Sequence, residues 1–160
     1  GANYVALLET NEKRGKKALK YKKVDEYYNA MDTNAINLLL EKTNGGFDKV
    51  IECCGNSPAV SEAIMTVKPG GTIVLVGVSL EPITIPTVVS VMHEVTLQGA
   101  IAYTEEEFDN VINLIATKQL NVEKYIDALV PLSKAQESFT RLTSGTDDAI
   151  KIIFKPEKNR

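Results

Sequence analysis

The chain has 160 residues, of which 44% are hydrophobic and 24% charged, and its formal net charge at pH 7 is −3. This length suits one globular domain, the acidic balance argues against a nucleic-acid partner, and no apolar run reaches the roughly 18–20 residues of a membrane helix. One histidine, His93, and the adjacent Cys53 and Cys54 fall short of the about three protein ligands that a catalytic zinc needs, so we expect neither catalytic residues nor metal ligands here.

The first half of the chain alternates between strand-like and helix-like segments. In chain order we expect a strand at Tyr4–Leu8, a helix at Glu12–Tyr21, a strand at Glu26–Tyr28, a helix ending at Lys42, a strand at Lys49–Cys53 and a helix ending before Pro69. Asparagine, aspartate, threonine and serine cap helices, which predicts caps at Asn11, at Asp32 or Thr33, and at Ser57 with Pro58 as the first helical residue. The basic side chains of residues 13–23 form either a solvated helix face or an edge that attracts anions.

The second half continues the alternation. Thr72–Val76 is apolar after its first residue, which predicts a strand buried on both faces, and Val95–Ala100 predicts another strand. Capping boxes at Thr104–Glu107 and Ser133–Gln136 predict helices to about Thr117 and Thr143. A last strand is expected at Ile150–Phe154, before a charged tail.

Strands that alternate with helices predict an α/β fold with a mainly parallel, doubly wound sheet. In such folds ligands bind at the carboxyl ends of the strands. The residues at those ends are Glu9, 52–55, 76–78 and 100–102.

Six stretches that end or flank these strands occur in the order and spacing of one known family. They are residues 5–14, 47–55, 67–78, 95–100, 129–133 and 149–156. On these stretches the chain resembles the carboxy-terminal, nucleotide-binding part of zinc-dependent medium-chain alcohol and polyol dehydrogenases. The resemblance implies a Rossmann-type sheet that binds NAD.

The resemblance also implies what this chain does not contain. Such domains open with a strand and a G-x-G-x-x-G loop about 20 residues before the acid of the second strand, and none of the ten glycines forms that motif. We therefore expect a truncated domain, with the first strand, the Gly-rich loop and a zinc-bearing catalytic domain lying upstream. Residues 1–118 would be the NAD-binding part, and residues 119–160 would return to the catalytic domain.

The resemblance implies a role for each cofactor-binding candidate. Glu9 would accept hydrogen bonds from the adenosine ribose, and Arg14 would reach the same ribose. Cys53 and Cys54 would pack against the adenosine, and Lys151 would lie near the pyrophosphate. The segments that flank the nicotinamide would be Val76, Gly77 and Val78 together with Ala100, Ile101 and Ala102.

Each candidate also has a plainer interpretation. Glu9 and Arg14 would then be solvated charges at a strand end and on a helix, Lys151 a surface lysine, and the two apolar segments ordinary strand ends. We expect His93 to be structural or exposed. The segment Glu81–Val91 resembles the one through which related subunits join their sheets, and Pro82 and Pro86 suit an edge strand.

The expected function is that of a cofactor-binding part of an NAD-dependent alcohol or polyol dehydrogenase, inactive by itself, with zinc in the upstream domain. Adjacent cysteines cannot easily pair with each other, which favours a reducing cytoplasm. We expect a homo-oligomer acting on a small alcohol or polyol, with no nucleic-acid or membrane partner and no signal peptide. The alternatives are a zinc-free quinone or enoyl reductase, a non-catalytic nucleotide-binding or assembly module, and another doubly wound protein such as a methyltransferase domain.

Overall fold

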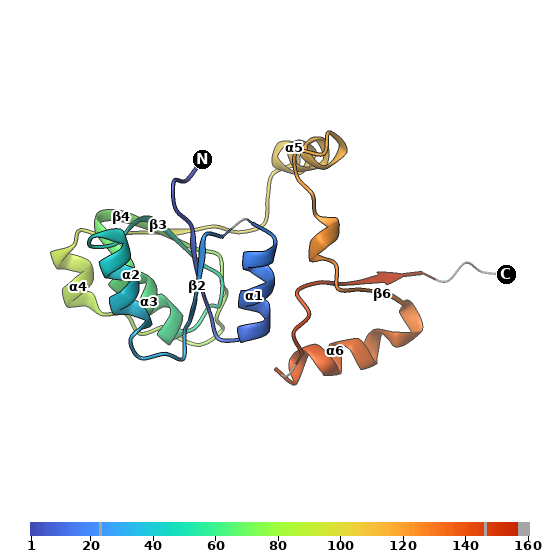
Figure 1. Cartoon of the computed structure of the whole chain (residues 1–160), viewed down its shortest axis with the longest axis horizontal. Coiled ribbons are helices and arrows are strands. Elements are labelled where there is room, and N and C mark those ends of the chain that lie inside the picture. Colours follow the sequence, from blue (N-terminus) through green and yellow to red (C-terminus); the bar gives the residue numbers. More distant parts are fainter. Residues whose placement is uncertain (23, 146, 157–160) are drawn as a thin grey trace. The chain divides into compact units, whose positions relative to one another are not determined.

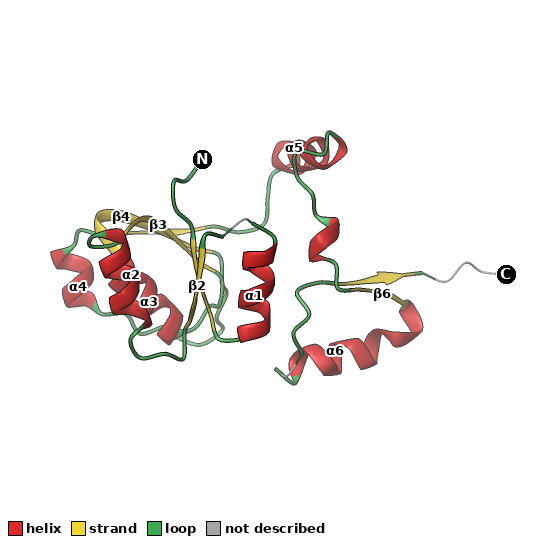
Figure 2. Ribbon diagram, viewed as in Figure 1, coloured by secondary structure: helices red, strands yellow, loops and turns green. Residues whose placement is uncertain are grey.

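The computed structural model describes residues 1–22, 24–145 and 147–156 as an alternating α/β chain (Figures 1 and 2). The strands are β1 (Ala6–Glu9), β2 (Glu26–Asn29), β3 (Phe47–Glu52), β4 (Val67–Leu75), β5 (Thr96–Gly99), β6 (Ala128–Pro131) and β7 (Ile152–Lys155). The α-helices are α1 (Glu12–Lys20), α2 (Ala35–Thr43), α3 (Ser57–Thr66), α4 (Thr87–Met92), α5 (Glu105–Ala116) and α6 (Ala135–Thr143). Short 3₁₀ turns lie at Glu123–Tyr125 and Leu132–Lys134.

Every strand pair is parallel, which confirms the predicted α/β class. The hydrogen-bonded ladders, however, form three sheets, with the strand orders β1-β2, β3-β4-β5 and β6-β7. The ladders stay separate because, in the described part of the chain, no strand pairs with both β1 and β3. The pair β6–β7 adds a strand that the sequence did not predict.

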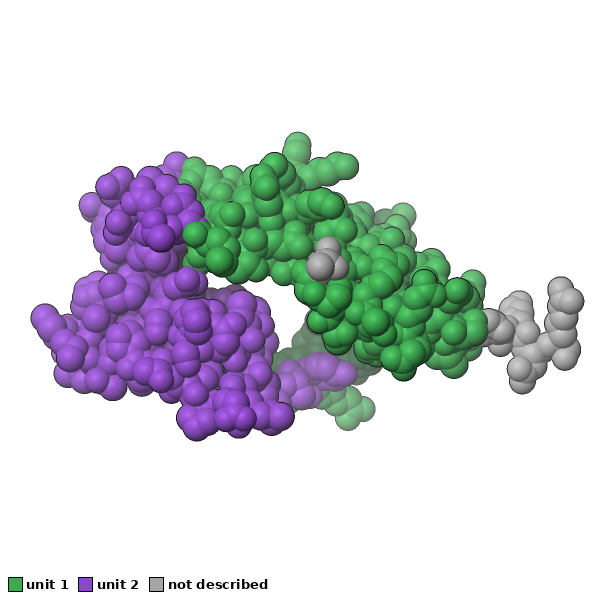
Figure 3. All heavy atoms as spheres, turned by 90° about the horizontal axis from the view of Figure 1, so that it is seen from below, with its two compact units in different colours: residues 1–31, 104–160 green, residues 32–103 purple. Residues whose placement is uncertain are grey.

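The chain divides into two compact units, which Figure 3 colours green and purple. Unit 1 comprises Gly1–Met31 and Thr104–Arg160, and unit 2 comprises Asp32–Tyr103. Unit 1 therefore consists of one segment from each end of the sequence. The division at residue 118, which concerns the family's domain boundary, stays a prediction.

The core of unit 2 lies between α3 and the sheet β3-β4-β5. Ile64 on α3 and Ile73 on β4 are completely buried, and Val60, Ala63 and Val67 join them. Burying an isoleucine side chain stabilises a fold by about 1.5–3 kcal/mol, so this cluster holds the helix on the sheet.

The prediction that Thr72–Val76 is buried on both faces is wrong. Thr72, Val74 and Leu75 are half-buried and Val76 is exposed. On the neighbouring strand β3, Ile51 keeps 68% of its surface exposed. Full burial is thus confined to the side of the sheet that α3 covers.

Two predicted helix caps are confirmed. Asn11 caps α1, because its side chain accepts hydrogen bonds from the backbone N–H groups of Lys13 and Arg14. Thr104 and Glu107 form the predicted capping box of α5. These caps are local, and the sequence alone specifies them.

Three other caps differ from the prediction. The cap of α3 is Asn56, which accepts from the N–H of Ala59 at 3.0 Å, whereas the Ser57 hydroxyl accepts from the N–H of Thr84 at 3.0 Å, and Pro58 is the second helical residue. Helix α2 has Asn34 at its cap position, because Asp32 instead accepts from the N–H of Asn34 in the preceding turn. Ser133 lies in a 3₁₀ turn, and α6 follows Lys134, whose side chain makes no cap.

The segment Glu81–Val91 forms no edge strand. Its second half is the short helix α4, with Pro86 at the cap position. The carbonyl of Pro86 accepts hydrogen bonds from the backbone N–H of Ser90 at 3.0 Å and from its hydroxyl at 3.0 Å. Proline suits this position because the N–H that it lacks has no partner at the start of a helix.

Candidate functional site

Glu9 is the last residue of β1, and its carboxylate is held by the chain that follows. Oε1 accepts hydrogen bonds from the Asn11 N–H at 2.9 Å and from Arg14 Nη2 at 2.8 Å. Oε2 accepts from Arg14 Nε at 3.1 Å. Two parallel bonds from one guanidinium fix the carboxylate in direction as well as in charge.

The environment of Glu9 keeps it ionised. Burial is the largest single influence and by itself raises the pKa of the carboxyl group. The hydrogen bonds from Arg14 and the Asn11 N–H, together with the Arg14 charge, act in the opposite direction and leave the pKa below its ordinary value. Glu9 is therefore a carboxylate at neutral pH, which can only accept hydrogen bonds.

This geometry fits a ligand that carries hydroxyl groups. Within the described residues, Oε2 accepts a single hydrogen bond, so it has room for another donor. The carboxylate also lies at the carboxyl end of a parallel strand, where ligands of such sheets bind. A dinucleotide ribose, with two neighbouring hydroxyls, matches this acceptor.

In unit 2 the ends of β3 and β4 meet at a pair of glycines. The carbonyl of Glu52 accepts from the N–H groups of Val76 at 2.8 Å and Gly77 at 3.0 Å. A Cβ atom on Gly77 would lie 2.1 Å from the backbone nitrogen of Gly55. Gly55 has a φ of +69°, and a Cβ there would lie 2.6 Å from the backbone of Val78. Only glycines allow the backbones to approach this closely.

Glu52 fixes the turn that leads from β3 to Gly55. Its side chain is buried, and Oε1 accepts from the N–H groups of Cys54 at 2.6 Å and Gly55 at 2.8 Å. The sequence predicts only that Glu52 lies at the strand end and indicates no role for it. The available signal was an acid that ends an apolar strand, followed three residues later by glycine.

Neither Cys53 nor Cys54 takes part in a disulfide bond, and both residues are exposed. The surroundings desolvate the Cys53 sulfur enough to raise the pKa of its thiol, and the nearby Glu52 charge raises it further. A reactive cysteine needs a lowered pKa. The arrangement therefore supports a contact role for this thiol rather than a nucleophilic one.

The two apolar segments, residues 76–78 and 100–102, follow the neighbouring strands β4 and β5 of unit 2. The N–H of Ala100 donates to the Leu75 carbonyl at 3.0 Å, which continues the ladder between β4 and β5. Beyond it, Val78 and Ile101 are exposed, and Ala102 has a φ of 49°. Both segments therefore offer backbone groups and exposed apolar side chains at the carboxyl edge of the sheet.

Lys151 lies in unit 1, immediately before β7. Its N–H donates to Asp127 Oδ2 at 3.1 Å, and its carbonyl accepts from the Asp127 N–H at 2.8 Å. Asp127 in turn pairs with Lys17 of α1. Neither partner was a candidate from sequence, because 110 residues separate them.

The predicted residues thus fall into two groups. Unit 1 holds Glu9, Arg14 and Lys151, and of these Glu9 and Arg14 are in direct contact. Unit 2 holds Cys53, Cys54 and the two apolar segments. There the close approach of the Gly55 and Gly77 backbones brings residues 53–55 next to residues 76–78.

The described residues contain no group of three or more His, Cys, Asp or Glu side chains that could hold a metal ion. His93 is the cap residue that follows α4, and its Nδ1 atom is buried with no hydrogen-bond partner in the described structure. A resident zinc therefore does not fit the described donor set. No helix among the described residues combines the length and the apolar character needed to cross a membrane.

Comparison with known proteins supplies a family context. A sequence model of a family described as "Zinc-binding dehydrogenase" matches residues 1–117. Alcohol dehydrogenase 1 of Zea mays is 32% identical over 164 residues, a match covering 98% of this chain and 42% of that protein. Sorbitol dehydrogenase of Gallus gallus is 32% identical over 105 residues, covering 66% of this chain and 29% of that protein.

The fold also matches solved structures. The crystal structure of 2R,3R-butanediol dehydrogenase from Bacillus subtilis aligns with a TM-score of 0.84 at 21% identity. That match covers 98% of this chain and 45% of the other chain. The chain therefore spans less than half the length of these relatives.

Proposed function

The chain belongs to the zinc-binding dehydrogenase family, and from this premise we propose that it supplies the nucleotide-binding part of an NAD-dependent alcohol or polyol dehydrogenase. The relatives named as alcohol and sorbitol dehydrogenases support the alcohol or polyol substrate class. When bound to such an enzyme, NAD would supply the redox chemistry by accepting a hydride from the alcohol.

The observation that carries the proposal is the fixed carboxylate of Glu9. It ends a parallel strand, is ionised, and is held by Arg14 and the Asn11 N–H. We assign it to the adenosine ribose, where a carboxylate can accept from both hydroxyls. Arg14 orients Glu9 and contributes a positive charge beside the same ribose.

The carboxyl edge of unit 2 serves the other parts of the dinucleotide in this proposal. The backbone at Gly55 and Gly77 carries no side chain that would block a flat ligand, and Cys53 and Cys54 provide small apolar contacts for the adenosine. The segments 76–78 and 100–102 provide backbone hydrogen-bonding groups for the nicotinamide carboxamide. Lys151 offers a cation for the pyrophosphate.

We propose further that the 160-residue polypeptide does not turn over alcohol by itself. Its sequence contains no G-x-G-x-x-G motif, and its described residues form no metal-binding group. In such an enzyme a zinc ion would polarise the alcohol oxygen, and we assign that ion to a part of the enzyme outside this chain.

The remaining assignments concern the surroundings of the protein. We propose a cytoplasmic location, because neither cysteine takes part in a disulfide bond and reducing compartments disfavour disulfides. We also propose that the chain associates with copies of itself, because several large apolar side chains of unit 2 are exposed, among them Val78, Leu80 and Val91.

The experiment that tests this function is an NMR titration of the ¹⁵N-labelled chain with NADH. The concentration should reach about 10 mM, so that even a millimolar Kd gives near-saturation. We expect shifts of the amide signals at Glu9–Arg14, Cys54–Gly55 and the two apolar segments. Glu9→Gln should weaken binding, and Glu12→Gln, an exposed acid of the same region, should leave it unchanged. Shifts confined to other residues, or none at all, would contradict the proposal.

A further inference from the structure

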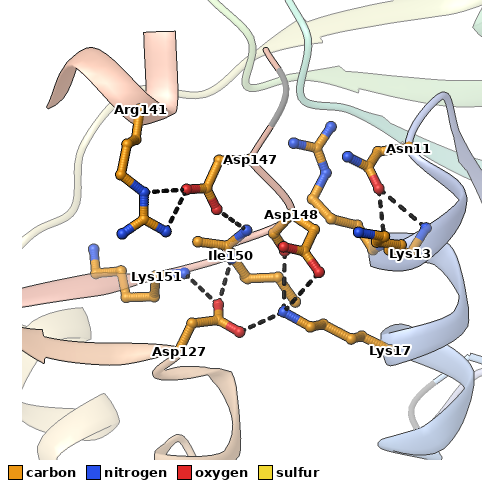
Figure 4. Close-up of polar contacts among 11 residues, drawn as sticks. Asn11, Lys13, Lys17, Asp127, Arg141, Asp147, Asp148, Ile150 and Lys151 are labelled. Carbon is orange, nitrogen blue, oxygen red and sulfur yellow. Dashed lines mark hydrogen bonds and ion pairs between the residues drawn. The ribbon is translucent and has the colours of Figure 1, made fainter. Parts of the chain in front are cut away.

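Asp127 holds two chain segments together just before β6 begins (Figure 4). Its Oδ2 accepts hydrogen bonds from the N–H groups of Ile150 at 2.5 Å and Lys151 at 3.1 Å. Its own N–H donates to the carbonyl of Lys151 at 2.8 Å. Asp127 thus makes three hydrogen bonds, two as acceptor and one as donor, which fix the backbone N–H and carbonyl groups of Lys151 and the N–H of Ile150.

The same carboxylate is tied to helix α1. Lys17 Nζ lies 2.5 Å from Asp127 Oδ1 and donates to the backbone carbonyl of Asp148 at 3.0 Å. The side chains of Lys17 and Asp127 are 28% and 19% exposed, so solvent screens this pair less than an open surface pair. Helix α1 directly follows Glu9, and the pair thus links the strand that carries Glu9 to the segment that carries Lys151.

A second ion pair stiffens the turn before Lys151. Arg141 donates from Nε to Asp147 Oδ2 at 2.9 Å, and Asp147 Oδ1 accepts from the Ala149 N–H at 2.8 Å. Together, Asp147 and Asp127 hold the backbone at residues 149, 150 and 151. The side chain of Lys151 extends away from Asp127 (Figure 4).

We propose that Asp127 is a positioning residue, which fixes the backbone of Lys151 so that its ammonium group is presented to the diphosphate of a dinucleotide. This inference rests on the proposed function. A lysine on a mobile turn loses conformational freedom when it binds an anion, and a turn ordered in advance avoids much of that cost. Asp127 orders the turn, and Lys17 orders Asp127.

The test uses the full 160-residue chain with NADH and adenosine as probes. Asp127→Ala and Lys151→Gln should each weaken NADH binding by about fivefold, which is a moderate loss on the affinity scale. Adenosine lacks phosphate, so its affinity should not change in either variant. Because both variants remove the same contact, the double variant should lose little more than either single variant. Asp109→Ala is the matched control, since Asp109 is an exposed acid on α5 of the same unit.

Amide hydrogen exchange supplies a readout that needs no ligand. Asp127→Ala should lose protection at Ile150 and Lys151, whereas Lys151→Gln should keep it. Asp127→Asn retains an acceptor oxygen and should keep both the protection and most of the NADH affinity.

The outcomes separate two failures. If the wild type does not bind NADH, the proposed function fails and the inference fails with it. If the wild type binds NADH but Asp127→Ala, or Lys151→Gln where the alanine variant does not fold, keeps the wild-type affinity, only the inference is overturned. Full additivity of the Asp127 and Lys151 effects would overturn it as well.

Discussion

The ion pair between Glu9 and Arg14 helps to fix the charge and the direction of the carboxylate at the end of β1. A solvated acid at a strand end would need no partner, yet Glu9 is bound by a guanidinium, a backbone N–H and the Thr10 hydroxyl. Burial disfavours its charge, and these partners more than compensate. The charge and direction of the carboxylate are therefore set before any ligand arrives.

Arg14→Gln should raise the pKa of Glu9, because burial then acts with fewer opposing bonds. The folded-state pKa of Glu9 lies below its ordinary value, so its ionised form stabilises the wild type above the unfolded-state pKa. That contribution is lost as the pH falls through the folded-state pKa, and the variant should lose it at a higher pH. A carboxyl ¹³C NMR titration measures the shift, with the exposed neighbour Lys13→Gln as control. An unchanged Glu9 pKa in Arg14→Gln would show that the ion pair does not control this group.

The close approach of Gly55 and Gly77 leaves no room for a side chain at position 77. Gly77→Ala would place a Cβ atom 2.1 Å from the backbone nitrogen of Gly55, whereas Gly99→Ala would meet no atom within 4 Å. We expect Gly77→Ala to lower the free energy of unfolding by about 2–4 kcal/mol and Gly99→Ala to change it little. Urea denaturation measures both, and equal stability of the two variants would refute the close crossing.

Helix α1 packs on β2 through a glycine and an aromatic ring. A Cβ atom on Gly15 would lie 2.3 Å from the Tyr27 ring, so the ring occupies the space of a side chain. The Tyr27 hydroxyl is buried, with no hydrogen-bond partner in the part of the chain that the structure describes. The tyrosine is therefore retained there by its shape rather than by its polar group.

Gly15→Ala should destabilise the wild type, although alanine is favoured over glycine inside a helix by about 1 kcal/mol. In a Tyr27→Ala background the clash is gone, and the same substitution should stabilise the chain. Thermal or urea unfolding of the four proteins in this double-mutant cycle gives the coupling directly. A Gly15→Ala variant that is more stable than the wild type would contradict the observed packing.

Features that depend on neighbouring residues could be predicted from the sequence. Features that depend on contacts with distant residues could not. Asn11 and Thr104 could be read as caps because their partners lie within three residues. Asn56 and Ser57 are both good caps, and the choice depends on Thr84, which lies 27 residues from Ser57. Glu9 and Arg14 could be found from an ordered family motif, whereas nothing in the sequence pairs Lys17 with Asp127.

At the scale of the whole chain, the separate ladders leave apolar surface in solvent. Ile51 on β3 is 68% exposed and Leu80 is 99% exposed. Large apolar side chains exposed to solvent are candidates for an association surface. Residues 81–91 form a loop and a helix, so any association through them proceeds by side-chain packing rather than by the predicted edge strand.

We therefore expect the chain to sediment with a mass above that of one chain at high micromolar concentration. Leu80→Ser combined with Val91→Ser should shift it towards the single-chain mass, because both side chains are exposed in unit 2. Leu129→Ser, an equally apolar exposed position in unit 1, is the control. A single-chain mass at every concentration would contradict the expectation.

The proposed function depends on the recognition of NAD through Glu9. A 2′-phosphate would place a charge of about −2 against this carboxylate, and like charges in contact cost several kcal/mol. The Arg14 cation offsets only part of that repulsion, because its Nε and Nη2 groups already donate to Glu9.

The most direct test compares NADH and NADPH binding to the wild type, to Glu9→Ser and to the control Glu12→Ser. We expect the wild type and Glu12→Ser to bind NADH at least about tenfold more tightly than NADPH, which corresponds to about 1.4 kcal/mol. In Glu9→Ser this difference in affinity should be smaller. Equal affinities of the wild type for the two nucleotides would show that Glu9 is only a charge at the end of a strand.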